Sequence, residues 1–158
     1  IKKRFNVDDP IANQVAQQAN GSFTEAVSLL DQSEDRKANF DRFKDWMRMC
    51  WTFDAQGLLD FSEKVAREGR ESNKSFLQFS LVAIRNSLAL NYTKYAYIRI
   101  AEEERVFYEN FSPFVNHLNI VMFTNEFNKA INHIERNVHS ALVFFDLSLT
   151  IVKLLKMK

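Results

Sequence analysis

Two amphipathic segments meet at NGSFTEAVSLL, residues 20–30 of the chain. Gly21 is the one glycine among the first 56 residues, and it stands where a helix C-cap is expected, between apolar-periodic segments at 11–19 and 23–30. Ser22 is placed to cap the second segment, because Glu25 three residues later completes a capping box. We therefore predict a helix-turn-helix corner here. The same residues also suit an ordinary turn between helices, which is not specific to one family.

The composition predicts an all-α fold. The 158 residues include only three glycines and two prolines, which are too few turn residues for a sheet protein. The net charge of +1, with 26% charged residues, gives no overall attraction to nucleic acid or to a membrane surface. The single Cys50 excludes an internal disulfide and fits a reducing compartment. The 15 phenylalanines indicate a large core or a large interface.

No stretch of the sequence predicts a membrane span or a signal peptide. The longest apolar region, residues 141–155, is interrupted by Asp146, Ser148, Thr150 and Lys153. We therefore expect a cytoplasmic protein without a membrane partner. The chain begins at Ile1 rather than at methionine, so we expect a part of a longer protein.

Helical periodicity extends over the rest of the chain. The polar run at 31–37 is the best candidate for a linker, and a solvated helix end is the alternative. After it we expect five or six helices. The first helix carries an apolar stripe of Phe40, Phe43, Met47, Cys50 and Trp51, with Trp46 beside it. A short helix near 58–66, closed by Gly69, and a long helix from Ser72 or Asn73 to about Tyr97 follow. The last three are a helix over 101–115, a helix opened by Asn116 or Asn119, and a buried closing helix over 140–156.

The corner at Gly21 resembles a segment of a known family. The pattern A-x-x-A-x-G-S-x-x-x-A-x-x-L-L, which ends at Leu30, is similar to the end of the helical lid domain in AAA+ ATPases of the bacterial clamp-loader family. In motor subunits of that family an arginine follows Gly-Ser-x and reaches the nucleotide, whereas this chain has Thr24. A hydroxyl supplies neither the charge nor the fork geometry of a guanidinium. The resemblance therefore implies the delta-prime type of subunit, which often lacks a working nucleotide site, and no cofactor is expected.

The second region carries three motifs: Phe43-x-x-Trp46-Met47-Arg48-x-Cys50, Phe114-Val115-Asn116, and Glu126-Phe127-Asn128-x-Ala130-x-x-His133-Ile134-Glu135-Arg136-Asn137. In this order they resemble the C-terminal collar domain of the same proteins. The resemblance implies that residues 1–35 end a lid and that 36–158 form a complete collar. It also implies non-catalytic assembly with gamma/tau-type and delta-type subunits of the DNA polymerase III clamp loader, so that the complex can load the sliding clamp during DNA replication. The clamp and primed DNA would be reached only through the whole complex.

Candidate catalytic and metal-binding groups are few. The carboxylates of Glu102–Glu104 would point about 100° apart on a helix, so a solvated helix start is favoured over an ion site. A di-iron bundle needs Glu-x-x-His on two helices, and none of His117, His133 or His139 has a glutamate three residues before it. Cys50 lies on the apolar stripe, which favours a buried, inert thiol. We expect no catalytic residue, no metal site and no enzyme activity in these residues.

One polar group remains as a candidate subunit interface: His133, Glu135, Arg136 and Asn137. An arginine flanked by aromatic residues is enriched at interface centres. Satisfaction of a helix end is the alternative role for the same side chains.

Two other functions are compatible with the residues. One is the lid and collar of a gamma/tau-type ATPase, which a Gly-x-x-x-x-Gly-Lys-Ser/Thr loop before Ile1 would indicate. The other is a stand-alone helical bundle, either an enzyme or a ligand carrier, with a pocket among the phenylalanines.

Overall fold

The computed structural model describes residues 23–93 and 100–157, with side chains from residue 34 onward. These residues form six α-helices and two short 3-10 helices and contain no strand, which confirms the predicted all-α class. No helix in the described ranges is both long and apolar enough to cross a membrane. The elements are α3 (Phe23–Thr52), α4 (Ala55–Ala66), α5 (Arg70–Thr93), η1 (Glu102–Glu104), α6 (Arg105–Phe111), η2 (Ser112–Phe114), α7 (Ile120–Glu135) and α8 (Ser140–Leu154).

The chain divides into two compact units, residues 1–39 and 40–158. The described part of the first unit is the beginning of α3, which starts at Phe23, directly after the predicted cap. The predicted corner at Gly21-Ser22 lies outside the described residues. The polar run at 31–37 is helical, and its residues from 34 onward are exposed. The assignment of 1–35 to a lid and 36–158 to a collar stays a prediction.

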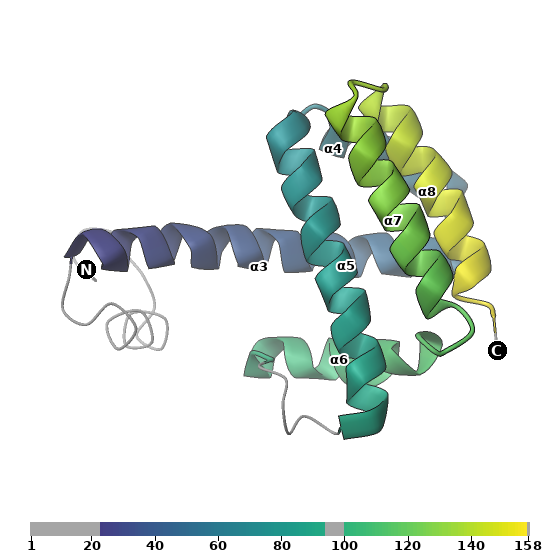
Figure 1. Cartoon of the computed structure of the whole chain (residues 1–158), viewed down its shortest axis with the longest axis horizontal. Helices are drawn as coiled ribbons and strands as arrows, with labels where there is room; N and C mark the ends of the chain where they lie inside the picture. The colour runs from purple at the N-terminus through teal and green to yellow at the C-terminus, as the bar shows by residue number, and fades with distance from the viewer. Residues whose placement is uncertain (1–22, 94–99, 158) are drawn as a thin grey trace. The chain divides into compact units, whose positions relative to one another are not determined.

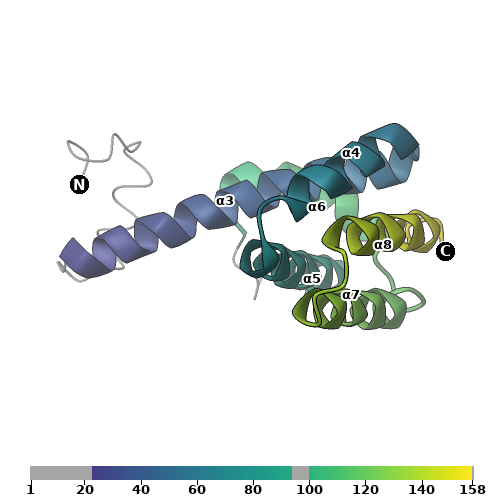
Figure 2. The same ribbon diagram turned by 90° about the horizontal axis from the view of Figure 1, so that it is seen from above.

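Three helices of the second unit run side by side. Helix α7 packs against α5 on one side and α8 on the other, and α4 packs against α8. Residues 40–52 of α3 cross these three helices (Figures 1 and 2), so this segment contacts several helices at once. Its amphipathic sequence allows this, because buried residues recur at spacings of three and four.

Trp46 lies at the centre of the core. Its indole is fully buried and contacts one ring from each of α4, α5, α7 and α8, with ring centroids 5.4 to 5.9 Å apart. Four residues of the predicted stripe, Phe40, Phe43, Met47 and Cys50, are buried, but the residue at the centre of the core is Trp46, which was predicted to lie beside the stripe. Trp51, which we placed on the stripe, is 48% exposed. The four rings around Trp46 are Phe61, Phe76, Phe127 and Phe144.

Four buried serines accompany the rings. Ser62, Ser80, Ser87 and Ser148 each donate a hydrogen bond to the carbonyl four residues earlier, at 2.6 to 2.8 Å. Their hydroxyls are thereby satisfied within their own helices. Ser148 also accepts a 2.8 Å bond from the indole Nε1 of Trp46, which joins α8 to α3 inside the core.

Gly69 separates α4 from α5, as predicted. Its φ of +94° lies in the left-handed region, where glycine carries no steric cost. Helix α5 begins at Arg70, earlier than the predicted caps Ser72 and Asn73, because the amide of Asn73 already donates to the carbonyl of Gly69 at 3.0 Å. The Asn73 side chain is fully buried instead, and neither its Nδ2 nor its Oδ1 has a partner among the described residues.

Candidate interaction surfaces

The predicted interface residues lie together at the C-terminal end of α7. The amide of Val138 donates to the carbonyl of His133 at 3.0 Å, and the amide of Asn137 donates to the carbonyl of Ile134 at 3.2 Å. Asn137 has a φ of +61°. These two bonds and the left-handed residue form a Schellman motif, which satisfies carbonyls that the helix end would leave free.

Two of the four predicted residues contact the start of α5. The ammonium of Lys74 donates to Glu135 at 2.8 Å, and Arg70 donates to the side-chain oxygen of Asn137 at 3.4 Å. The hydrogen bond and positive charge of Lys74 lower the pKa of Glu135, and the same bond raises the pKa of Lys74. The side chains of Glu135 and Asn137 thus join the end of α7 to the start of α5, and the backbone amide of Asn137 satisfies a carbonyl of the helix end. A subunit contact through this group stays a prediction.

Sequence reasoning missed Lys74 and Arg70 as partners of this group. The sequence held only a weak signal, since a cation such as Arg70 in the first turn of a helix is slightly disfavoured by the helix dipole. The other two predicted residues have fewer contacts. His133 is half-buried beside α8, in a crevice of about 20 Å³, and Arg136 is exposed.

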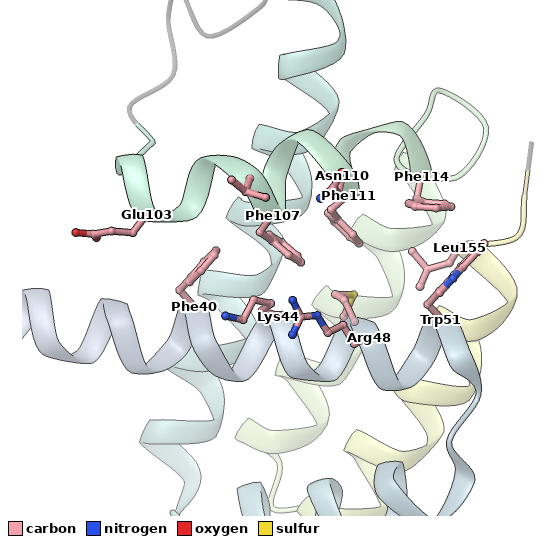
Figure 3. Close-up of a pocket in the computed structure, with 12 residues that line it drawn as sticks. Phe40, Lys44, Arg48, Trp51, Glu103, Phe107, Asn110, Phe111, Phe114 and Leu155 are labelled. Atoms are coloured by element: carbon pink, nitrogen blue, oxygen red, sulfur yellow. The ribbon is translucent and has the colours of Figure 1, made fainter.

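A larger hollow lies between α3 and α6, beside the face of α3 that packs into the core (Figure 3). It has a volume of about 340 Å³, and we call it the α3–α6 groove. Most of its wall is apolar or aromatic. It is lined by Phe40, Lys44, Met47, Arg48 and Trp51 of α3, by Glu103, Val106, Phe107, Asn110, Phe111 and Phe114 of the η1–α6–η2 segment, and by Leu155 after α8.

Ring contacts between α3 and the η1–α6–η2 segment surround the groove. Phe40 meets Phe107 edge to face with ring centroids 5.5 Å apart, and Trp51 meets Phe114 at 4.5 Å. Between these two contacts, Phe43 packs against Phe107 and Phe111 with ring centroids 5.8 and 5.6 Å apart, and Lys44 and Arg48 line the hollow beside them. The gap between the ring pairs is the groove.

The groove has an excess of positive charge. Lys44 and Arg48 contribute two cations, and Glu103 is the one carboxylate in the lining. In Figure 3 the Glu103 carboxylate points away from the groove. Lys44 lies 3.9 Å from Asp41 and 5.8 Å from the ring centroid of Phe40. Among the described residues, Arg48 makes no ion pair.

Asparagine side chains hold the η2 end of the groove. Asn91 of α5 donates to the carbonyls of Ser112 and Val115 at 2.8 and 2.9 Å. Asn119, which is fully buried, donates to the carbonyls of Phe114 and Leu154 at 2.8 and 3.0 Å. These bonds fix the backbone that carries Phe114. Asn119, one of two residues predicted to open α7, directly precedes the helix, and the other, Asn116, accepts at its Oδ1 from the amides of Leu118 and Asn119 at 2.9 and 3.1 Å.

The glutamates and the cysteine considered in the sequence lie in different environments. The described residues contain no group of three or more histidine, cysteine, aspartate or glutamate side chains that could hold a metal ion. Glu102 and Glu103 are exposed as predicted, but Glu104 is buried. Burial raises the pKa of Cys50 to about 12, so its thiol stays protonated at neutral pH, as predicted for an inert cysteine.

The predicted sensor position, Thr24, lies in α3 within the part of the helix whose side chains are not described. The α3–α6 groove itself was not predicted, although Phe107, Phe111 and Phe114 recur at helical spacing and mark one of its walls. Searches against protein-family models, curated proteins and solved structures gave no match to the chain.

Proposed function

We propose that the chain is a non-catalytic assembly domain from the delta-prime type subunit of a bacterial clamp loader. The observation that carries the proposal is the α3–α6 groove, where a half-exposed tryptophan lies near an arginine that has no ion pair among the described residues. Trp and Arg are the residues most often found at the energetic centres of protein interfaces. A helical bundle with such a surface is suited to binding other subunits.

The resemblance of the sequence to clamp-loader subunits is the reason for proposing a clamp loader as the assembly. The lid-like pattern precedes the collar-like motifs, as it does in clamp-loader subunits, and Thr24 stands where motor subunits carry an arginine. On this proposal the partners are gamma/tau-type and delta-type subunits, and the protein functions in the cytoplasm during DNA replication. It needs no cofactor in these residues.

Reconstitution tests the proposal. The chain is mixed at micromolar concentration with a gamma/tau-type motor subunit and a delta-type subunit of the same organism, and the mass of the complex is measured by light scattering after gel filtration. We expect a complex that contains all three proteins, and addition of the chain should permit clamp loading. Absence of any complex would contradict the proposal. ATP hydrolysis by the longer parent protein, with Thr24 at the nucleotide, would instead support a motor subunit.

The groove volume of about 340 Å³ favours a second function, the binding of a small molecule, because it lies at the lower end of the range for small-molecule pockets. On this alternative the chain is a ligand carrier. A thermal-shift screen with small apolar acids tests it, since a bound ligand raises the melting temperature.

A further inference from the structure

We propose that the α3–α6 groove binds an amphipathic helix of another protein subunit, one whose apolar side chains flank a carboxylate that pairs with Arg48. The inference rests on the proposed function for the identity of the partner. The residues that line the groove determine the chemistry of its occupant.

The exposed rim of the groove favours a protein segment over a small molecule. Val106 is 66% exposed and Trp51 is 48% exposed, and both line the groove. A ligand of about 340 Å³ would contact these two side chains only where they line the hollow. A helix that inserts side chains between α3 and α6 would cover them with its own backbone and flanking residues, and it would thereby bury the apolar surface that now faces water.

The charge of the groove specifies the polar group of the occupant. Any apolar occupant removes water from around the Arg48 guanidinium, and an unpaired charge is costly to bury. Glu103 points away and does not serve as the counter-ion (Figure 3). A carboxylate on the occupant would supply it, through the bidentate hydrogen bonds that arginine forms with planar anions. Lys44 adds a second positive charge nearby.

The shape of the groove suits a helix. Ring pairs bound it at both ends, Phe40–Phe107 with centroids 5.5 Å apart and Trp51–Phe114 with centroids 4.5 Å apart, so the side chains of an occupant would enter between the two pairs. An amphipathic helix presents apolar residues at spacings of three and four on one face, which places adjacent anchors in one such hollow.

A pair of synthetic helical peptides tests the groove independently of the clamp loader. Both carry the same leucine and phenylalanine face, and they differ only in one central residue, glutamate or glutamine. We expect the chain to bind the glutamate peptide at least tenfold more tightly by calorimetry, and we expect Arg48→Glu to abolish this preference. Equal binding of the two peptides, or binding of neither, would overturn the inference. Stabilisation of the chain by an apolar fatty acid, but by neither peptide, would overturn it in favour of a small ligand.

Matched variants test the same surface against the purified motor subunit. Arg48→Glu and Val106→Asp alter the groove, and Arg85→Glu and Val82→Asp make the same changes at exposed positions of α5. Circular dichroism first establishes that all four variants fold. If Val106→Asp does not fold, Arg48→Gln replaces it, because it removes only the charge. We expect the groove variants to weaken binding at least tenfold and the α5 variants to change it less than twofold.

The peptide experiment and the motor-subunit experiment together distinguish failure of the groove inference from failure of the proposed function. If the motor subunit binds and the groove variants bind as well as the α5 variants, the groove inference is overturned and the proposed function stands. If the glutamate peptide binds in the expected manner and the motor subunit does not bind, the groove chemistry is supported and the proposed function fails.

Discussion

The two sides of residues 40–52 of α3 carry similar aromatic residues but differ in how they are covered. On one side, Trp46 is enclosed by rings from four helices. On the other side the η1–α6–η2 segment provides most of the opposing wall, and a hollow of about 340 Å³ remains. Aromatic content therefore does not separate core from surface in this protein. What separates them is the number of helices that converge on each side.

The largest expected effect is on the enclosed side. Trp46→Ala removes four ring contacts and leaves the Ser148 hydroxyl without its indole donor, so we expect the free energy of unfolding to fall by about 3–5 kcal/mol. Trp51→Ala is the matched control, with an expected loss of about 1 kcal/mol, because its ring is half-exposed and contacts Phe114. Urea denaturation measures both. Similar losses of stability in the two variants would contradict the difference in packing between the two sides of α3.

A smaller effect is expected where the groove wall is attached to the bundle. Asn119→Ala leaves the carbonyls of Phe114 and Leu154 without their donor in a buried site, so we expect a loss of about 1–3 kcal/mol in urea denaturation. The exposed Asn128 of α7 provides the control, and Asn128→Ala should change stability little. A loss no greater than that of the control would show that packing, rather than hydrogen bonds, holds the wall.

The pH dependence of stability tests how well the enclosed side of α3 excludes water, because the thiol of Cys50 is buried there. Its folded pKa is raised from 9.0 to about 12, so above pH 9 the unfolded chain loses the thiol proton while the folded chain keeps it. The Cys50 contribution to stability is therefore lost as pH rises, by about 1 kcal/mol between pH 9 and 10. Denaturation at both pH values, compared with Cys50→Ala, isolates this contribution. An identical pH dependence in the variant would mean that water reaches the thiol.

The smallest effect is expected at the exposed pair between α5 and α7. Glu135→Gln removes the ion pair with Lys74, but both side chains are solvated, so we expect little change in the melting temperature at neutral pH. The pKa of Glu135 is lowered in the fold, so its small contribution is present at neutral pH and is lost as the solution becomes acidic.

The same variant also distinguishes the two roles of the α7 end. Unchanged affinity for the motor subunit is expected if Glu135 only joins α5 to α7. A large loss of affinity, with stability unchanged, would place this residue in a subunit interface as the sequence predicted.

Helical periodicity predicted most of the fold. It located the apolar faces of α4, α5, α7 and α8 because their buried residues recur at spacings of three and four. It did not separate Trp46 from Trp51, since both lie on or beside one stripe and only tertiary contacts bury the first. It also missed the start of α5, because a glycine carbonyl, rather than a polar side chain, receives the amide of Asn73.

The candidate sites were less predictable than the helices. The group at 133–137 was found from its composition, but its contacts depend on Lys74 and Arg70, which are distant in sequence. The α3–α6 groove is formed by residues of three segments that are distant in sequence, and a local sequence pattern does not predict how closely such segments pack. Its aromatic walls were visible in the sequence, whereas the gap between them was not.

The bond between Trp46 and Ser148 has a consequence for how α3 and α8 are aligned. Ser62, Ser80 and Ser87 donate only within their own helices, so their hydroxyls do not fix the position of one helix along another. A shift of α8 by one turn, about 5.4 Å along its axis, would separate the Ser148 hydroxyl from the indole and leave the indole N–H without an acceptor in an apolar interior. Together with the Asn119 bond to the carbonyl of Leu154, the Ser148 hydroxyl thus favours one axial position of α8 over others with similar apolar contacts.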